Sequence, residues 1–407
     1  MTRQKYISLI LILGSMTALG PFTIDMYLPG FSAIAADLHT TANKVSLSLS
    51  SYFIGIAAGQ LLYGPLLDRY GRKSPLYAGL LVYILASIGC SLVNDIDTFI
   101  GLRFIQAVGS CAATVAAMAM VRDLFPVDDN PKVFSLLMLV VGLSPMLAPT
   151  VGSYVIKASG WHTIFIILGI IGLCVLLAAR FGLGHTRTPD PTISLKPKPI
   201  INGFISVLRH PQFYTYAISG GVAFSGLFTY VAGSPILFMD IFKVSGETYG
   251  WIFAFMSVSF IGTSQLNSVL LRNYKSGQLV YIGLALQTII SVTFLIAAVN
   301  NLLNLYSTIT MLFLYLGCLG LTNPNTAGLS LAPFSENAGS ASALMGALQL
   351  GLGAVASMLV GIFVKTSMVP MIAIMTGSTL LALIILLIGK RNINIVAESD
   401  SDIPVMH

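Results

Sequence analysis

Residues 6–30 read "YISLILILGSMTALGPFTIDMYLPG" and form an apolar run with a single acid, Asp25, near its end. No charged residue stands between Lys5 and Asp25, which are separated by 19 residues. A helix needs about 20 apolar residues to cross a bilayer, so this run predicts a membrane-spanning helix. A carboxylate inside such a helix is costly and marks a functional site, which makes Asp25 the first candidate.

The composition of the whole chain supports a membrane location. Of the 407 residues, 56% are hydrophobic and 9% are charged. Soluble domains carry about 25% charged residues, so this chain could not cover a soluble surface. We therefore expect an integral membrane protein. The scattered histidines and cysteines show no ligand spacing, and we expect no metal site.

Charge-free runs of spanning length recur twelve times. The stretch from Ser276 to Ser335 is too long for one helix, and "NNLLN" at 300–304 divides it into two. These runs predict an all-α membrane protein with twelve spans in two pseudo-symmetric six-helix bundles. The predicted spans cover residues 6–30, 44–67, 75–94, 98–122, 132–157, 161–182, 212–239, 248–271, 276–299, 303–329, 338–364 and 366–389.

The basic residues predict the orientation. Of the 21 Lys and Arg residues, 16 fall on the side of the two termini and four on the other side. Because cytoplasmic loops are rich in Lys and Arg, we expect both termini in the cytoplasm. This distribution explains the net charge of +6 by topology, and we expect no nucleic-acid partner.

The longest polar segment, "GHTRTPDPTISLKPKP" at 184–199, lies mid-chain and contains four prolines. It predicts an extended cytoplasmic linker, and "IINGFISVLRHP" after it predicts a short interfacial helix. The polar end of the chain predicts a disordered tail. We therefore divide the chain into bundle 1–182, linker 183–211, bundle 212–390 and cytoplasmic tail 391–407.

The loop "GPLLDRYGRKSPL" at 64–76 carries more charge than topology requires. Asp68 ends a helix, where the dipole disfavours an anion, so we expect it to have a basic partner or a helix N-terminus nearby. The spacing resembles the signature loop of the major facilitator superfamily. That resemblance implies a cytoplasmic gate latch made by Gly64, Asp68, Arg69, Gly71, Arg72 and Lys73, with Arg122 and Asp123 as gate partners. The alternative is a purely topological anchor.

The predicted fifth span reads "GLSPMLAPTVGSY" at 142–154, with Gly142, Pro145, Pro149 and Gly152 at helical spacing. Its two prolines predict a kinked helix. It resembles the antiporter motif of drug exporters, with Ala148 in place of the usual glycine before the second proline. Three further stretches narrow the resemblance to the Bcr/CflA family of drug:proton antiporters: "IDMYLPGFSAIAADL" (24–38), "RFIQAVG" (103–109) and "LAPFSENAGSASALMGALQ" (331–349).

Aromatic and amide side chains of the spans that line the cavity in this fold are the candidate substrate contacts. Such groups suit small amphipathic molecules that are neutral or zwitterionic. Packing or a lipid-interface role is the alternative for each aromatic. The candidates are Tyr27, Tyr52, Gln106, Phe224, Phe228, Tyr230, Phe255, Asn323, Asn325 and Gln349.

Asp25 lies five residues from the predicted outer end of its span, about 7.5 Å at 1.5 Å per residue. Arg103 lies at a similar depth in the fourth span, so the two charges could pair and offset the cost of their burial. We expect Asp25 to carry the coupling proton and Arg103 to be its counter-charge. A permanent ion pair without proton traffic is the alternative.

The chain has no G-x-x-x-x-G-K-[ST] loop for ATP, so an ion gradient is the expected energy source. The resemblance implies that this is a proton gradient, and no cofactor is expected. Together with these features, the resemblance implies a multidrug efflux antiporter of the bacterial inner membrane that contributes to antibiotic resistance and is not an enzyme. Its expected partners are a small-molecule substrate, protons and lipid, and we expect a monomer. The alternative function is export of a natural metabolite such as an amino acid, peptide or siderophore.

Overall fold

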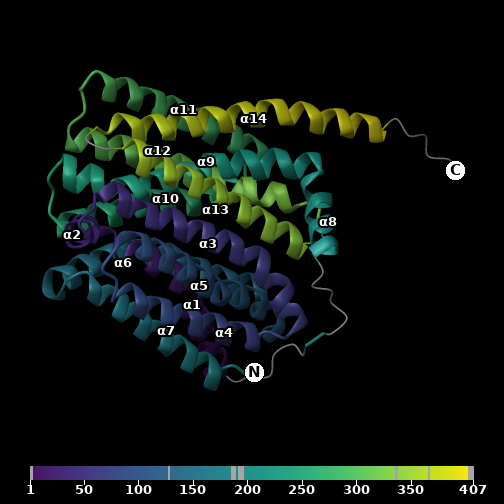
Figure 1. Cartoon of the computed structure of the whole chain (residues 1–407). Coiled ribbons are helices and arrows are strands. Elements are labelled where there is room, and N and C mark those ends of the chain that lie inside the picture. Colours follow the sequence, from purple (N-terminus) through teal and green to yellow (C-terminus); the bar gives the residue numbers. More distant parts are fainter. Residues whose placement is uncertain are drawn as a thin grey trace.

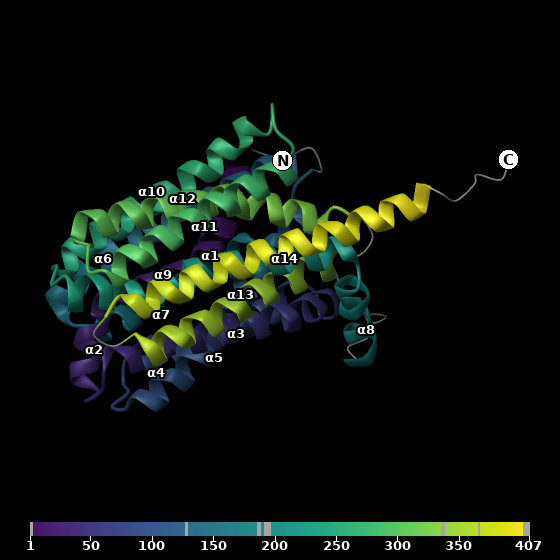
Figure 2. The same cartoon turned by 90° about the horizontal axis from the view of Figure 1, so that it is seen from above.

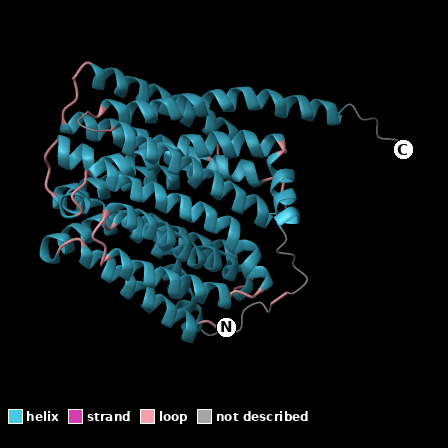
Figure 3. Cartoon of the chain, in the orientation of Figure 1, coloured by secondary structure: helices cyan, strands magenta, loops and turns pink. Residues whose placement is uncertain are grey.

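The structure is a computed structural model that describes residues 3–126, 129–184, 189–190, 197–334, 338–364 and 367–401. Every regular element in these ranges is helical (Figure 3). Twelve of the helices are long and apolar enough to cross a membrane, which confirms the predicted number of spans in the described part of the chain. The elements are α1 Arg3–Asp25, η1 Leu28–Gly30, α2 Phe31–Asp37, α3 Ala42–Arg69, α4 Lys73–Cys90, α5 Ile96–Leu124, α6 Asn130–Ser159, α7 His162–Gly182, α8 Pro197–Leu208, α9 Pro211–Pro235, η3 Ile236–Ile241, α10 Gly246–Leu270, α11 Ser276–Val299, α12 Leu305–Leu331, α13 Ala338–Phe363 and α14 Val369–Ser401.

The first span differs from its prediction at its end. Helix α1 stops at Asp25, five residues earlier than expected, and the chain continues through η1 into the short helix α2. Pro29 explains the break, because it has no amide hydrogen to donate to the carbonyl of Asp25. Asp25 therefore stands at the C-terminal end of a helix.

Polar side chains begin several spans. Thr41 accepts a hydrogen bond from the amide of Lys44 at the start of α3, and Asp95 accepts one from Thr98 at the start of α5. Asn304 does the same for α12, which confirms the predicted break at 300–304. Such caps satisfy amides that have no partner within the helix.

The helices form two groups, with α1–α7 in the N-half and α9–α14 in the C-half (Figure 1). Within the halves, α3 packs on α5 and α9 packs on α14. The halves meet where α3 lies against α13 and α6 against α10, and Figure 2 shows α3 beside α13 from above. The start of α1, the end of α14 and α8 lie at one end of the molecule, here the α8 end, and α2 lies at the other, the α2 end.

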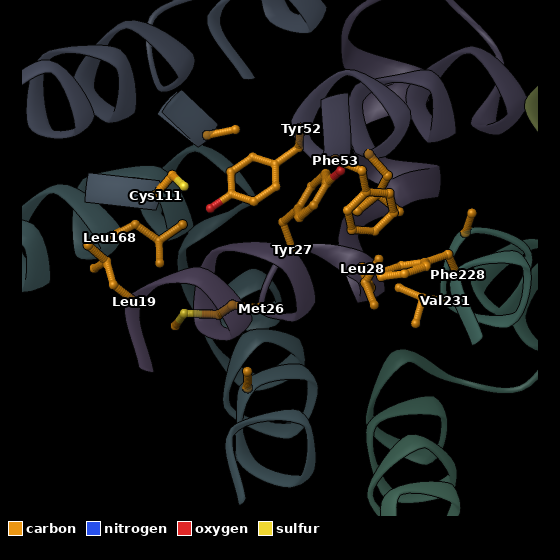
Figure 4. Close-up of a cluster of buried hydrophobic side chains, with 14 of the residues drawn as sticks. Leu19, Met26, Tyr27, Leu28, Tyr52, Phe53, Cys111, Leu168, Phe228 and Val231 are labelled. Carbon is orange, nitrogen blue, oxygen red and sulfur yellow. The ribbon is translucent and has the colours of Figure 1, made fainter. Parts of the chain in front are cut away.

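The hydrophobic core shows how the halves are joined. Its largest cluster contains residues of both halves, and Figure 4 shows Leu28 of η1 beside Phe228 and Val231 of α9. Two smaller clusters, around Tyr216 and Phe213, contain residues of the C-half together with Val207 of α8. The apolar packing between the halves therefore belongs to the cluster that includes η1, next to α2.

Two predictions outside the spans have different outcomes. The predicted interfacial helix is present as α8, with Ile201, Ile205 and Leu208 exposed. The tail predicted from residue 391 begins within α14, which continues to Ser401, and no proline or glycine interrupts residues 391–401. Most of the predicted extended linker, 185–188 and 191–196, and the last residues, 402–407, lie outside the described residues.

Candidate functional site

Asp25 is buried at the junction of the two halves. Only 4% of its surface is exposed, and its carboxylate takes part in none of the ion pairs within the described ranges. It interacts electrostatically with the phenols of Tyr230 on α9 and Tyr249 on α10, both in the C-half. The acid of the first span therefore faces the opposite half and has no cationic partner in the described structure.

Arg103 is fully buried within the N-half. Its Nη1 donates to Oε1 of Gln106 at 2.5 Å, and its Nη2 donates to the carbonyl of Thr23 at 3.1 Å. The guanidinium carbon lies 4.3 Å from the ring centre of Tyr27 and 4.4 Å from that of Tyr52. Two charge-assisted hydrogen bonds and two cation–π contacts offset the cost of burying the charge.

The predicted pairing of Asp25 with Arg103 is therefore wrong for this structure. Arg103 lies at the level of Asp25 along α1, because it reaches the carbonyl of Thr23, two residues away. Depth along a helix does not fix which side of the helix a residue faces. The hydroxyl of Thr23 bonds Tyr83 of α4 at 2.7 Å, so Thr23 faces into the N-half. Two residues turn an α-helix by about 200°, which directs Asp25 to the other side.

Arg72 joins two acids at the α8 end. Its Nη1 donates to Oδ1 of Asp68 at 2.6 Å, and its Nε donates to Oδ2 of Asp123 at 2.7 Å. Burial by itself lowers the pKa of Arg72. The hydrogen bonds to the two carboxylates raise this pKa by more than burial lowers it, so the net shift is upward. The basic partner predicted for Asp68 is confirmed. The cluster ties the end of α3 to the end of α5 within the N-half.

The other predicted gate residues lie around this cluster. Gly71 has a φ of +77°, which lets the chain turn between α3 and α4. Lys73 donates to the carbonyl of Leu183 at 2.9 Å and so holds the end of α7. Arg69 lies over the ring of Tyr70, and Gly64 has open space where a side chain would stand. Arg122 is exposed and does not join the Arg72 cluster.

Small residues of α6 allow close packing near Asp25. Helix α6 continues through Pro145 and Pro149. A side chain at Gly152 would collide with the carbonyl of Met26, the residue after Asp25. Gly142 faces Ile261 of α10. The predicted antiporter motif thus packs against both the turn that follows α1 and the C-half.

The predicted cavity residues separate into groups. Tyr27, Tyr52 and Gln106 surround Arg103 inside the N-half. Phe228 lies where the halves meet, and its ring centre is 4.5 Å from that of Phe53. The ring centre of Phe224 is 5.4 Å from that of Phe228.

The C-half candidates also separate. Tyr230 is buried and stacks on Phe253 at 5.4 Å. The amide of Asn325 donates to Asn267 at 2.6 Å between α12 and α10. Phe255 does not line a cavity, because it is 50% exposed on the apolar outer stripe of α10 that includes Trp251. Buried and exposed residues recur at helical spacing along α10, and Phe255 lies on the side away from the packed helices.

Asn323 and Gln349 line a pocket between α9, α12 and α13. The pocket is small, with a cavity volume of about 10 Å³. Nε2 of Gln349 donates to Oδ1 of Asn323 at 2.8 Å, which bridges α12 and α13. These are the two predicted cavity residues that the structure brings together in an open pocket.

Side-chain hydrogen bonds between the halves of the described chain all lie toward the α2 end. Lys157 and Glu247 form an ion pair between α6 and α10, and the sequence signal for it is opposite charge at the same end of two spans. The bonds are Ser32–Asp240, Asn43–Gly361, Ser50–Ser357, Thr150–Gly250 and Lys157–Glu247. The halves are therefore closed at the α2 end, and no such bond in the described part joins them at the α8 end.

Comparison with known proteins agrees with this architecture. The family model of the Major Facilitator Superfamily matches residues 13–358. The chain belongs to the major facilitator superfamily. It is accordingly a multi-pass membrane transporter of small molecules and not an enzyme.

Bacterial members of the superfamily are similar over most of their length. The chain is 33% identical to the MFS-type transporter YdgK of Bacillus subtilis, over 92% of this chain and 93% of that one. It is 30% identical to a bicyclomycin resistance protein homolog of Haemophilus influenzae, covering 92% and 94%, and to the multidrug resistance protein MdtL of Escherichia coli, covering 89% and 93%. These names agree with the Bcr/CflA resemblance of the sequence.

A solved superfamily structure shares the fold. It is a bacterial homolog of the human lysosomal transporter Spinster, in an inward-facing and unoccupied conformation. The TM-score is 0.66 at 13% sequence identity, and the match covers 96% of each chain. At this identity the likeness shows the fold alone.

Proposed function

We propose that this transporter is a proton-coupled antiporter that exports drug-like or other small amphipathic molecules across the bacterial inner membrane by alternating access. Relatives named for bicyclomycin and multidrug resistance support the substrate class. The observation that carries the proposal is Asp25, a buried acid between the halves without a cation beside it in the described structure. The proton gradient is the energy source, no cofactor is needed, and the unit is a monomer.

The position of Asp25 supplies a coupling mechanism. An ionised carboxylate without a partner is costly to bury, whereas a protonated one is far less so. The closed α2 end therefore favours protonated Asp25. When that end opens, water reaches the carboxylate of Asp25, which takes up a proton from the outside. Loss of the proton toward the cytoplasm makes the closed arrangement unfavourable and favours outward opening with the substrate bound.

The Arg72 cluster supplies the gate at the other end. We propose that the α8 end is cytoplasmic, with both termini on that side, as the distribution of basic residues predicts. Within the described residues, Asp68 bonds to Arg72 of its own half, which fits a gate that is released. When the α8 end closes, Asp68 would be free to approach the C-half, and the N-half bonds of Arg72 would hold the loop in shape.

The test of coupling uses Asp25→Asn in sealed vesicles. The amide has nearly the same shape but cannot exchange a proton. We expect the variant to bind substrate and to lose uptake driven by a pH gradient. Asp37→Asn is the control, because Asp37 lies at the α2 end beside His162 and is half exposed. Preserved gradient-driven uptake in Asp25→Asn would show that the proton travels elsewhere.

The test of substrate class is efflux from a bacterium that lacks its own exporters. A panel of antibiotics and dyes is compared with a panel of amino acids, peptides and siderophores, with and without an uncoupler. We expect export of several drug-like compounds that the uncoupler abolishes. Export that ignores the uncoupler rejects proton coupling, and export restricted to metabolites favours a metabolite exporter.

A further inference from the structure

Helix α8 differs from the spans in length and in direction. It has 12 residues and is about 18 Å long at 1.5 Å per residue, which is too short to cross a hydrocarbon core of about 30 Å. Figures 1 and 2 both show it lying across the spans rather than along them, at the α8 end of the molecule. In a membrane protein, a helix with this length and direction lies at the level of the lipid headgroups.

One side of α8 packs on the C-half. The side chain of Val207 is buried in the apolar cluster that includes Phe213 of α9 and Ala341 of α13. The amide of Arg209 donates to the carbonyl of Ile205 at 3.0 Å, so the helical geometry continues one residue past the end of α8. The position of each side chain around the helix therefore follows from a rotation of about 100° per residue as far as Arg209.

The side of α8 that faces away from the C-half carries an apolar stripe with two cations beside it. Ile201, Ile205 and Leu208 are exposed and stand within about 60° of one another around the helix. Lys198 and Arg209 are also exposed, and they stand about 20–40° from Ile205 on the other side of the stripe. A helix that lies in a membrane surface has this order, with apolar side chains toward the acyl chains and cations at the headgroups.

The charge around this face has one sign. Neither Lys198 nor Arg209 takes part in an ion pair within the described residues. No acid stands between Asp190 and Asp240 in the sequence, so the chain around α8 offers no local counter-charge. A second copy of the chain docked by the same face would bring like charges together, which is costly. A surface of anionic lipid supplies both acyl chains for the stripe and phosphates for the cations.

We propose that the exposed face of α8 is a binding surface for anionic phospholipids in the leaflet at the α8 end. The stripe of Ile201, Ile205 and Leu208 enters the acyl region, and Lys198 and Arg209 contact the lipid phosphates. A basic residue near an anionic surface strengthens binding about fivefold. The surface is independent of the transported molecule and of proton coupling, so its test does not depend on the proposed function.

The experiment measures which lipids contact α8. The purified full chain, without its four native cysteines, carries a fluorophore on Ile205→Cys, which leaves Ile201 and Leu208 in place. It is reconstituted into vesicles of phosphatidylcholine and phosphatidylglycerol. Brominated acyl chains quench the fluorophore on contact, and they are placed on phosphatidylglycerol in one sample and on an equal amount of phosphatidylcholine in the other. We expect about fivefold more contact with phosphatidylglycerol.

Two charge variants and a second label position serve as comparisons. Lys198→Gln with Arg209→Gln keeps the stripe and removes both cations, so the two samples should be quenched equally. Arg272→Gln with Lys275→Gln makes the same change between α10 and α11 and should keep the preference. A label on Ile289→Cys lies at an exposed position in a stretch of α11 without charged residues, so it should contact both lipids equally.

Equal quenching at Ile205→Cys while Lys198 and Arg209 are present overturns the proposal, and this comparison needs no charge variant to fold. Absence of quenching by either lipid also overturns it, because the face then lies away from the membrane. A label that becomes shielded only at high protein density assigns the face to a second copy of the chain instead. A preference that survives the loss of both cations rejects their role in selecting the lipid.

Discussion

Gly250 of α10 offers a direct test of how the two halves close at the α2 end. A side-chain carbon at this position would lie 2.9 Å from the Cα of Thr150 and 3.3 Å from the carbonyl oxygen of Pro149, both in α6. Ordinary contact begins at 3.4 Å. Since the obstructing atoms are backbone, they cannot rotate away. Gly250→Ala therefore requires α6 and α10 to separate by about 0.5 Å.

Overpacking of this kind costs about 1–3 kcal/mol. The cost applies only where the halves touch at the α2 end, because the methyl group meets no backbone once α6 and α10 part. The ratio of closed to open molecules at that end should fall roughly five- to 150-fold, at tenfold per 1.4 kcal/mol. Gly262→Ala is the matched control, since it lies on the same helix with no atom within 4 Å. Both variants share the gain in helix propensity.

The assay is oxidative cross-linking between Lys157→Cys and Glu247→Cys in a background without the four native cysteines. The native side chains form an ion pair across the α6–α10 contact, so the two thiols report closure at the α2 end. We expect Gly250→Ala to slow cross-linking and Gly262→Ala to leave it unchanged. Equal rates in both variants would refute the reasoning that this contact limits closure.

Two further predictions concern the ends of the spans. Asp68→Asn weakens its bond to Arg72, and we expect a lower transport rate with normal membrane insertion and substrate binding; wild-type turnover would reduce the loop to a topological anchor. The hydrogen bonds from Thr98 hold the pKa of Asp95 below 3.8, so the ionised cap stabilises the fold above that pH and is lost as pH falls through the lower folded-state pKa. Asp95→Ala should therefore lower Tm at pH 7, and the difference from wild type should shrink in acid; a pH-independent difference contradicts this origin.

Features that depend on neighbouring residues could be predicted from the sequence. Charge-free runs of spanning length predicted the twelve helices, because the cost of an unsatisfied backbone in lipid leaves a helix as the way for such a run to cross. The break at 300–304 and the basic partner of Asp68 could also be predicted, because both depend on residues that are close in the sequence. Asp68 and Arg72 are four residues apart, so local geometry brings them together.

The tertiary structure decided which way each buried side chain faces. Depth along a helix follows from counting residues, but direction around the helix depends on how the bundle packs. For this reason Asp25 and Arg103 were assigned to the same level and yet point apart, with Asp25 toward Tyr230 and Arg103 toward Gln106. The contact of Lys157 with Glu247 joins residues 90 positions apart. Such pairs depend on the approach of whole helices, which is set by the summed packing of many side chains and not by any short stretch of sequence.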